Sequence, residues 1–360
     1  MGNAFHYQNS FDDNLAKEFR QILSLEDPFS PLQIPNLKLW LDASDRQEVE
    51  LTYSQDGLLG ATASGTAGAY SISTSLDLSA VLEVGNRVRI GSAGAVAAAS
   101  IIGENSYTIS AISAAQISVS EPLQSSFTNQ PLFRGLVSRW KDKSGGNHHA
   151  QQTSQDLMPS WVAKKQNSRD IIRFSGVANN VSDIGDHMFN ASLPNYAQGN
   201  ITLFSTQYQT ALNRWAAIIS LNYLSNQNPI QTWKIEGDEF GVNIVGTSES
   251  GVFVDTNGNN LNNWWVGSFR REGGGAGLNK PITLDMRGVQ NLKTTGLQSW
   301  SSTVNSGFLI GRHWMGTSIG TFEGFLPEIM LFDRVLTDVE LLKLQNYQAS
   351  KWGFALAPLS

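Results

Sequence analysis

The chain has 360 residues, a formal net charge of −6 at pH 7 and no cysteine. The acidic balance argues against a nucleic-acid partner, because binding phosphates needs a basic face. Lack of cysteine excludes disulfide bonds and thiolate metal sites. Apolar residues make up 41% of the sequence, enough for a large core. However, no apolar run is long enough for a membrane span, and we expect neither membrane insertion nor a secretory signal.

Residues 1–35 are predicted to form an N-terminal arm outside the folded body. Its apolar stripe is typical of a short amphipathic helix and consists of Leu15, Phe19, Ile22 and Leu23. The prolines that follow favour an extended chain. An apolar stripe of this kind must be buried, either against the protein's own body or against a partner subunit. We therefore expect a docking arm and a homo-oligomer, of which a trimer is one form.

The first expected strand lies in 36–45 and ends in an acidic turn. Leu37, Leu39 and Leu41 alternate with polar or aromatic residues, which predicts that these three leucines share one face and that Trp40 points to the other.

Residues 46–134 differ in composition from the rest of the chain and are rich in Ala, Ser, Gly and Thr. Short alternating runs such as 84–92 and 106–113 follow each other at a spacing typical of a small barrel or sandwich. The segment has no histidine and few aromatic residues. We interpret it as a structural or contact-making insert without catalytic groups.

From residue 135 the chain reads as a series of strands bounded by Gly, Asn, Ser or Pro. The strand candidates are 169–176, 200–209, 214–223, 232–245, 263–272, 282–288 and 307–314. No helical pattern alternates with them, so a two-sheet sandwich is favoured over a parallel α/β fold.

The stretch 324–353 predicts a strand followed by a helix. In the strand, Ile329 and Leu331 lie on one face and Met330 and Phe332 on the other, so both faces are expected to be covered.

The helix is predicted from local signals. Thr337 and Glu340 match a capping box, Leu336 and Leu341 match a hydrophobic staple, and Gly353 stands where a helix should stop.

Five segments together resemble a known family. They are LWLDASD at 39–45, WKDKSGGNHHA at 140–150, IIRFSG at 171–176, FLIGR at 308–312 and the closing stretch 324–353. In this order they resemble the laminin-G-like branch of the concanavalin A-like lectin and glucanase jelly rolls.

The resemblance implies an all-β jelly-roll sandwich built from 36–45 plus 135–353. Residues 46–134 would then be an inserted small β domain, preceded by the arm 1–35, with one C-terminal helix and a tail at 354–360.

Members of this family occur in bacterial surface proteins and in phage structural proteins, where they bind glycans or pack. The resemblance thus implies a non-enzymatic virion surface protein, either a tail or baseplate adhesin that contacts host glycans or a head decoration protein. Its partners would be itself, other virion proteins and a host-surface glycan. A cellular carbohydrate-binding module, with an extracellular location, is the alternative, followed by a glycoside hydrolase.

Some enzymes of this superfold place two Glu around an Asp on one strand, because glycoside cleavage needs two carboxylates at a fixed separation. Glu328 lacks that spacing, and we interpret it as an edge residue without a catalytic partner. Glu236, Asp238 and Glu239 surround Gly237, which predicts a turn. We therefore expect no enzymatic activity.

An Asn-rich stretch begins like a calcium loop, with Asp255, Asn257 and Asn259 at alternate positions. The Gly and Glu that an EF-hand requires later in the loop are replaced by Asn260 and Val266. We interpret it as a hairpin turn without a cofactor. A weaker calcium site with ligands from other loops is the alternative, since many laminin-G-like domains hold calcium.

Sugars stack on exposed aromatic rings, while Asn and Asp side chains bind their hydroxyl groups. Because Trp264 and Trp265 are neighbours on a predicted strand, one should face the core and the other solvent. The candidate glycan-binding residues are Trp233, Trp264, Trp265, Trp314, Asn257 and Asn259. Core packing is the alternative for each tryptophan.

Overall fold

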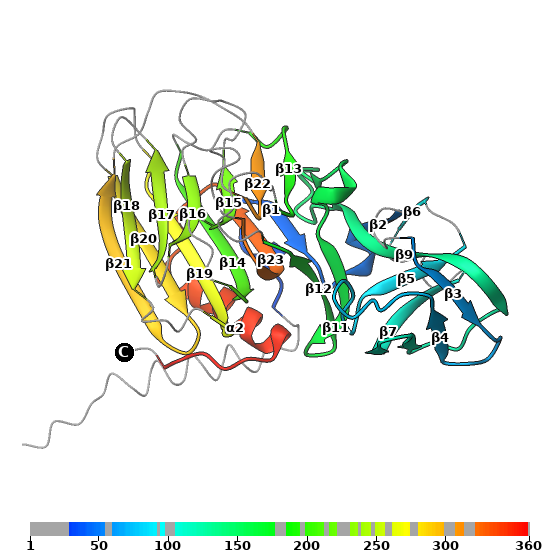
Figure 1. Ribbon diagram of the computed structural model, residues 1–360. Helices are drawn as coiled ribbons and strands as arrows, with labels where there is room; N and C mark the ends of the chain where they lie inside the picture. Colours follow the sequence, from blue (N-terminus) through cyan, green and yellow to red (C-terminus); the bar gives the residue numbers. More distant parts are fainter. Residues whose placement is uncertain are drawn as a thin grey trace, which may run out of the picture.

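The fold is a β-sandwich with a helix on one side and a smaller β unit at one end (Figure 1). The computed structural model describes residues 29–54, 60–91, 94–97, 105–176, 185–194, 199–211, 216–221, 231–236, 239–245, 249–255, 261–273, 280–298, 307–312 and 321–358. Within these ranges the chain is mostly strand, with a single α-helix. Short 3-10 helices occur at Pro31–Gln33, Arg46–Glu48 and Gln155–Leu157. None of the helices described is long and apolar enough to cross a membrane.

The first sheet is organised around β23 (Gly324–Phe332). This strand pairs along one edge with β14 (Ile201–Gln209), and along the other with β1 (Leu37–Asp42) and β12 (Arg169–Phe174). Beyond β14 the sheet continues through β19 (Trp264–Arg271), β20 (Lys280–Arg287) and β21 (Asn291–Gln298). Every one of these pairings is antiparallel, and β23 is a central strand because it is paired along both edges.

The second sheet faces the first. In order of pairing it contains β9 (Phe127–Trp140), β10 (Ala150–Gln151), β13 (Met188–Asn190), β22 (Phe308–Ile310), β15 (Ala216–Leu221), β16 (Gln231–Glu236), β17 (Glu239–Val245) and β18 (Glu249–Asp255). β11 (Ser160–Gln166) pairs with both β12 and β9, which joins the two sheets along one side.

Alternate residues of β23 belong to two different cores. Ile329 and Leu331 lie in the sandwich core, the cluster between the two sheets that also contains Phe308 and Ile310. Met330 and Phe332 lie in the helix-side core, together with residues of α2 (Asp338–Trp352). Each of these four β23 residues is fully buried. The prediction that this strand is covered on both faces is confirmed.

Helix α2 begins and ends where local chemistry predicts. Thr337 and Glu340 form a complete capping box, and Gly353 ends the helix in the left-handed conformation with φ 67°. Leu336 and Leu341 are both buried in the helix-side core, which is where the predicted staple would place them.

The alternation read from the first strand is wrong at one position. A register shift in the pairing with β23 separates Leu37 from Leu39. Leu39 and Leu41 lie in the sandwich core, whereas Leu37 packs against the helix-side core together with Trp40. An irregularity of this kind moves a side chain to the other face of the sheet, and the hydrophobic pattern alone does not reveal it.

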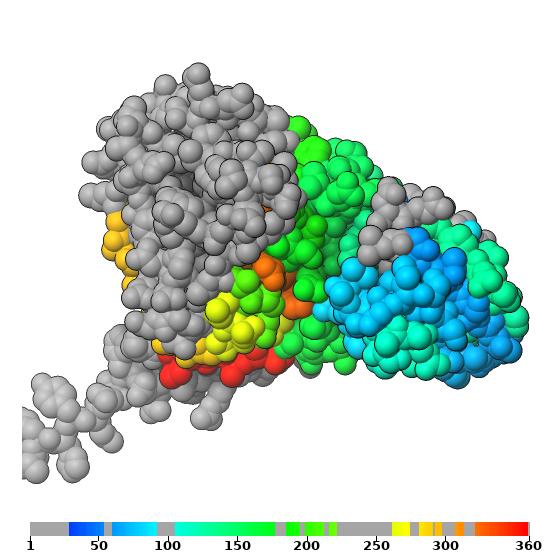
Figure 2. Space-filling model, viewed as in Figure 1, coloured from blue at the N-terminus to red at the C-terminus, as the bar shows by residue number. Residues whose placement is uncertain are grey.

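The insert has a small core of its own, which includes Ile72, Val88, Ile109 and Ile117. Its strands are β3 (Thr62–Gly65), β4 (Ser71–Thr74), β5 (Arg87–Ile90), β7 (Ser106–Ser113) and β8 (Gln116–Val119). Figure 2 shows this unit protruding at one end of the molecule, away from β20 and β21 in Figure 1.

Two strands connect the insert with the sandwich. The first half of β9 pairs with β3 and β5, and its second half pairs with β10 and β11. β2 (Val49–Ser54) pairs with β9 on one edge and with β6 (Gly94–Ala97) on the other. Val49, Leu51 and Tyr53 of β2 contribute to the sandwich core.

Candidate binding site

The predicted tryptophan pair lies on β19 and its two rings face opposite sides. Trp265 is only 1% exposed and belongs to the sandwich core, so it has no face to offer a sugar, and its assignment as a glycan platform is wrong. Trp264 faces outward from the sandwich core, but its ring stacks on Phe354, with centroids 6.0 Å apart and planes 14° apart. Tyr208 lies 5.0 Å from the same ring. The protein's own aromatic rings therefore occupy much of the surface around Trp264.

The other predicted site residues are not placed by the structure. Trp314, Asn257, Asn259 and the arm residues Leu15, Phe19, Ile22 and Leu23 lie outside the described residues. Trp233 and Asp255 lie in β16 and β18, where the backbone but not the side chains is described. The glycan loop, the calcium alternative and the docking arm thus stay predictions. Among the side chains that are described, no group of three or more His, Asp or Glu is arranged to hold a metal ion.

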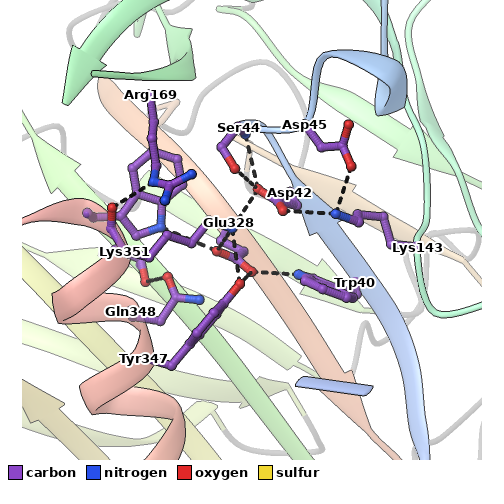
Figure 3. A network of polar contacts seen from close by, with 12 residues as sticks. Trp40, Asp42, Ser44, Asp45, Lys143, Arg169, Glu328, Tyr347, Gln348 and Lys351 are labelled. Atoms are coloured by element: carbon purple, nitrogen blue, oxygen red, sulfur yellow. Dashed lines mark hydrogen bonds and ion pairs between the residues drawn. The ribbon is translucent and has the colours of Figure 1, made fainter. Parts of the chain in front are cut away.

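A buried ionic network lies between the first sheet and α2. Asp42 of β1 and Glu328 of β23 are directly opposite each other in the strand pairing. Lys351, near the end of α2, places its Nζ 2.8 Å from Asp42 Oδ1 and 2.8 Å from Glu328 Oε2 (Figure 3). One ammonium group therefore bridges two carboxylates from two strands.

Several further groups surround this bridge. Trp40 Nε1 donates a 2.6 Å hydrogen bond to Glu328 Oε1, and Trp352 Nε1 donates one of 3.3 Å to Oε2. Lys143 Nζ lies 3.1 Å from Asp42 Oδ2 and 4.5 Å from the Trp40 ring centroid. These contacts form because residues two apart on a strand lie on the same face, so Trp40 and Asp42 of β1 both face α2.

The two carboxylates differ in their electrostatics. Burial acts to raise the pKa of Asp42, but Lys351 and Lys143 outweigh it and hold that pKa below its ordinary value. Burial raises the pKa of Glu328, against the attraction of Lys351 and with the help of the Asp42 charge. Burial together with the Glu328 carboxylate also raises the pKa of Tyr347. Asp42 thus carries the firmer negative charge of the pair.

This network is sealed from solvent. Glu328 is 1% exposed and Asp42 3% exposed, so neither carboxylate can reach a substrate. The interpretation of Glu328 as an edge residue is wrong, because β23 is paired along both edges and Glu328 contacts a cation and two indole N–H donors. These partners, Lys351, Trp352 and Trp40, lie 23, 24 and 288 residues away in the sequence, and Lys351 near the end of α2 was the nearest signal. The geometry anchors α2 to the sheet.

An open hollow lies on the insert, the segment that the sequence predicts to be structural or contact-making without catalytic groups. It has a volume of about 470 Å³ and is lined by Ile90, Gly91, Asn105, Ser125, Ser126, Phe127, Thr128 and Gln130. No ionisable side chain is among these lining residues. The hollow is thus a candidate site for an uncharged ligand.

The wall formed by β9 contains an irregularity in its pairing with β3. Ala63 pairs with Gln130 and Gly65 with Phe127, so β9 holds one more residue than β3 between these pairs. Asn129 takes up the extra length with a left-handed φ of 48°. Bulges of this kind redirect side chains, and Phe127, Thr128 and Gln130, which flank this one, are all among the residues that line the hollow.

Comparison with known proteins gives neither a family nor an activity. No family model and no curated protein matches the chain. Solved structures similar to it include the botulinum neurotoxin type G receptor-binding domain, at 13% identity and a TM-score of 0.40, with 60% of this chain and 51% of that chain covered. The sialidase CBM40 of Ruminococcus gnavus bound to α2,3-sialyllactose has 14% identity and a TM-score of 0.34, covering 48% of this chain and 96% of that one. An arabinofuranosidase complexed with arabinofuranosyl-α-1,2-xylobiose has 11% identity and a TM-score of 0.45, covering 83% and 63%.

The match to the botulinum neurotoxin domain covers about half of the length of that domain. Likeness at these TM-scores assigns no function.

Proposed function

We propose that this protein is a non-enzymatic recognition protein of a virion surface, either a tail or baseplate adhesin that contacts host glycans or a head decoration protein. The observation that carries the proposal is the rigid presentation of the insert. β9 runs without a break from the insert into the sandwich, so the open hollow is held at a fixed place on a stable β scaffold. The laminin-G-like motifs and the predicted docking arm support the virion setting.

Further contacts fix the orientation of the insert. Gly85 accepts a 2.7 Å hydrogen bond from the Ala163 N–H through its backbone oxygen. A Cβ at Gly85 would lie 2.7 Å from Ala163 O, so only glycine allows this approach. Glu83 lies 3.0 Å from Arg173 of β12. These contacts hold the insert in one orientation relative to the sandwich, which suits a unit that presents a binding surface. A hinge between the two parts would need fewer such contacts.

The carboxylates of the buried network are not available for glycoside hydrolysis. Glycoside hydrolysis needs two carboxylates that reach the same glycosidic bond, about 5 to 9.5 Å apart. Asp42 and Glu328 form the closest carboxylate arrangement that the network offers, and both are sealed and ion-paired. A panel of defined glycans should stay intact with the full chain. Hydrolysis that disappears in Glu236→Gln or Glu239→Gln would overturn this part.

Location in a particle is the test of the virion setting. We expect cryo-microscopy of the intact particle to show copies of this chain on its surface, docked through residues 1–35 to themselves or to other virion proteins. The position of those copies on the head or the tail decides between decoration and adhesion. A chain that is absent from particles and is instead secreted by cells would contradict the virion proposal and favour a cellular carbohydrate-binding module.

A further inference from the structure

We infer that the hollow of the insert is a binding site for a neutral saccharide, an inference that rests on the proposed recognition function and names its site. The hollow lies between the ends of β5 and β7 and the first half of β9. Neither Trp264 nor Trp265 is among its lining residues.

The chemistry of the lining selects an uncharged ligand rich in hydroxyl groups. Ser125, Ser126 and Thr128 contribute hydroxyls, and Asn105 and Gln130 contribute amides. These groups both donate and accept hydrogen bonds, as sugar hydroxyls do. A sialylated or phosphorylated ligand would need a cation to offset the loss of hydration of its charge.

Arg87 is the buried cation of this part of the insert, and it is already engaged. Its Nη1 lies 2.6 Å from Thr108 Oγ1 and 3.2 Å from Glu121 Oε1. Arg87 is 3% exposed and is not part of the lining. An anionic ligand in the hollow would therefore find no cation among the lining side chains that the structure describes.

Phe127 gives the hollow an apolar surface. Part of its ring occupies the space next to Gly65, where a Cβ would lie 2.9 Å from Phe127 Cζ and 2.5 Å from Leu123 Cδ1. Phe127 packs against the insert core but remains partly exposed. A half-buried, immobilised aromatic ring suits the C–H face of a sugar, because binding then orders no additional side chain.

The part of the rim that contains Asn105 and Ser125 is already ordered by hydrogen bonds. Asn105 adopts a left-handed φ of 57°. Its Oδ1 accepts hydrogen bonds from Ser125 Oγ at 3.2 Å and from Tyr107 Oη at 3.4 Å. Tyr107 Oη in turn accepts one of 3.1 Å from the Gln124 N–H. A volume of about 470 Å³ falls within the range of small-ligand sites. The hollow thus has room for a small ligand, and the hydrogen bonds of Asn105 order part of its rim before a ligand binds.

The test uses the full chain on an array of neutral and sialylated oligosaccharides, followed by titration calorimetry with the strongest neutral one. We expect neutral oligosaccharides to bind. Phe127→Ala and Gln130→Ala should each raise Kd about tenfold or more. Tyr70→Ala is the matched control, because Tyr70 is a 57% exposed aromatic residue of the insert outside the lining, and its Kd should change less than about twofold.

Two results would overturn the inference. If neutral glycans bind equally well to Phe127→Ala and Gln130→Ala, recognition lies elsewhere and the proposed function survives without this site. If the chain binds only sialylated glycans, or none, the neutral-saccharide assignment fails, while location on the particle still tests the virion proposal. Gln130 is exposed, so its variant keeps the test informative even where the loss of Phe127 unfolds the insert.

Discussion

Replacing Lys351 with methionine removes the cation that bridges two buried carboxylates. In the variant, Asp42 and Glu328 would remain opposite each other beneath α2 without a positive charge between them. We expect Lys351→Met to lower the free energy of unfolding more than any other single change to the exposed or half-exposed side chains of the helix.

The magnitude follows from the geometry. Each carboxylate oxygen lies 2.8 Å from Lys351 Nζ, so each attraction is about 6 kcal/mol at an effective dielectric constant of about 20. Much of this is offset by the cost of burying the ammonium group. Breaking a buried ion pair by removing one partner typically costs about 3 to 5 kcal/mol, and we expect a value in this range.

Urea unfolding followed by tryptophan fluorescence measures the effect, since Trp40 and Trp352 report from within the network. Lys343→Met is the matched control, because Lys343 lies on the same helix and takes part in none of the ion pairs among the described residues. It should change the free energy of unfolding by less than about 0.5 kcal/mol. Glu328→Gln combined with Lys351→Met should recover part of the loss, since the remaining carboxylate, Asp42, keeps its ion pair with Lys143.

The pH dependence provides a second check. Without Lys351, the pKa values of both carboxyl groups should rise in the folded state, so the native variant binds protons more readily than its unfolded chain. The loss relative to wild type should then be largest near pH 7 and shrink as the pH falls towards 4. A Lys351→Met variant as stable as Lys343→Met at pH 7 would refute the reasoning.

Three further predictions concern single residues. Gly353→Ala should cost about 1 to 3 kcal/mol in urea unfolding, because φ is 67° there and a Cβ would lie 2.9 Å from the Asn167 side chain; an unchanged midpoint would contradict it. Hydrogen bonds from Arg334 lower the pKa of Glu340 to about 2, so its contribution should be lost as pH falls from about 4.5 towards 2, and Glu340→Gln should flatten that part of the stability curve. Burial raises the pKa of Asp186 to about 7, so wild-type stability should decline as pH rises from about 4 to 7, and a decline that persists in Asp186→Asn would argue against this origin.

The sequence determined those features that depend on neighbours a few residues away. Thr337 and Glu340 specify the start of α2, and Gly353 specifies its end, because capping uses backbone groups within one turn. The period of two in β23 likewise determined that its alternate residues face two separate cores. The mainly β character and the sandwich arrangement follow from the same kind of signal.

Only the tertiary structure decided how distant residues meet. The shift between Leu37 and Leu39 depends on the register with β23, which local alternation does not contain. The hollow is assembled from the ends of β5, β7 and β9, so no single segment carries its pattern.

The tryptophans and the charged network also depend on contacts between distant residues, which the sequence pattern does not specify. Sequence alternation required that one of Trp264 and Trp265 face the core, but only the packing of the sheets showed that it is Trp265. The strand that contains Glu328 does not reveal its contacts, because its cation is supplied by a helix that folds back over the sheet and the carboxylate opposite it by the first strand. Long-range strand pairing creates these contacts, and a one-dimensional pattern specifies each strand but not its neighbours.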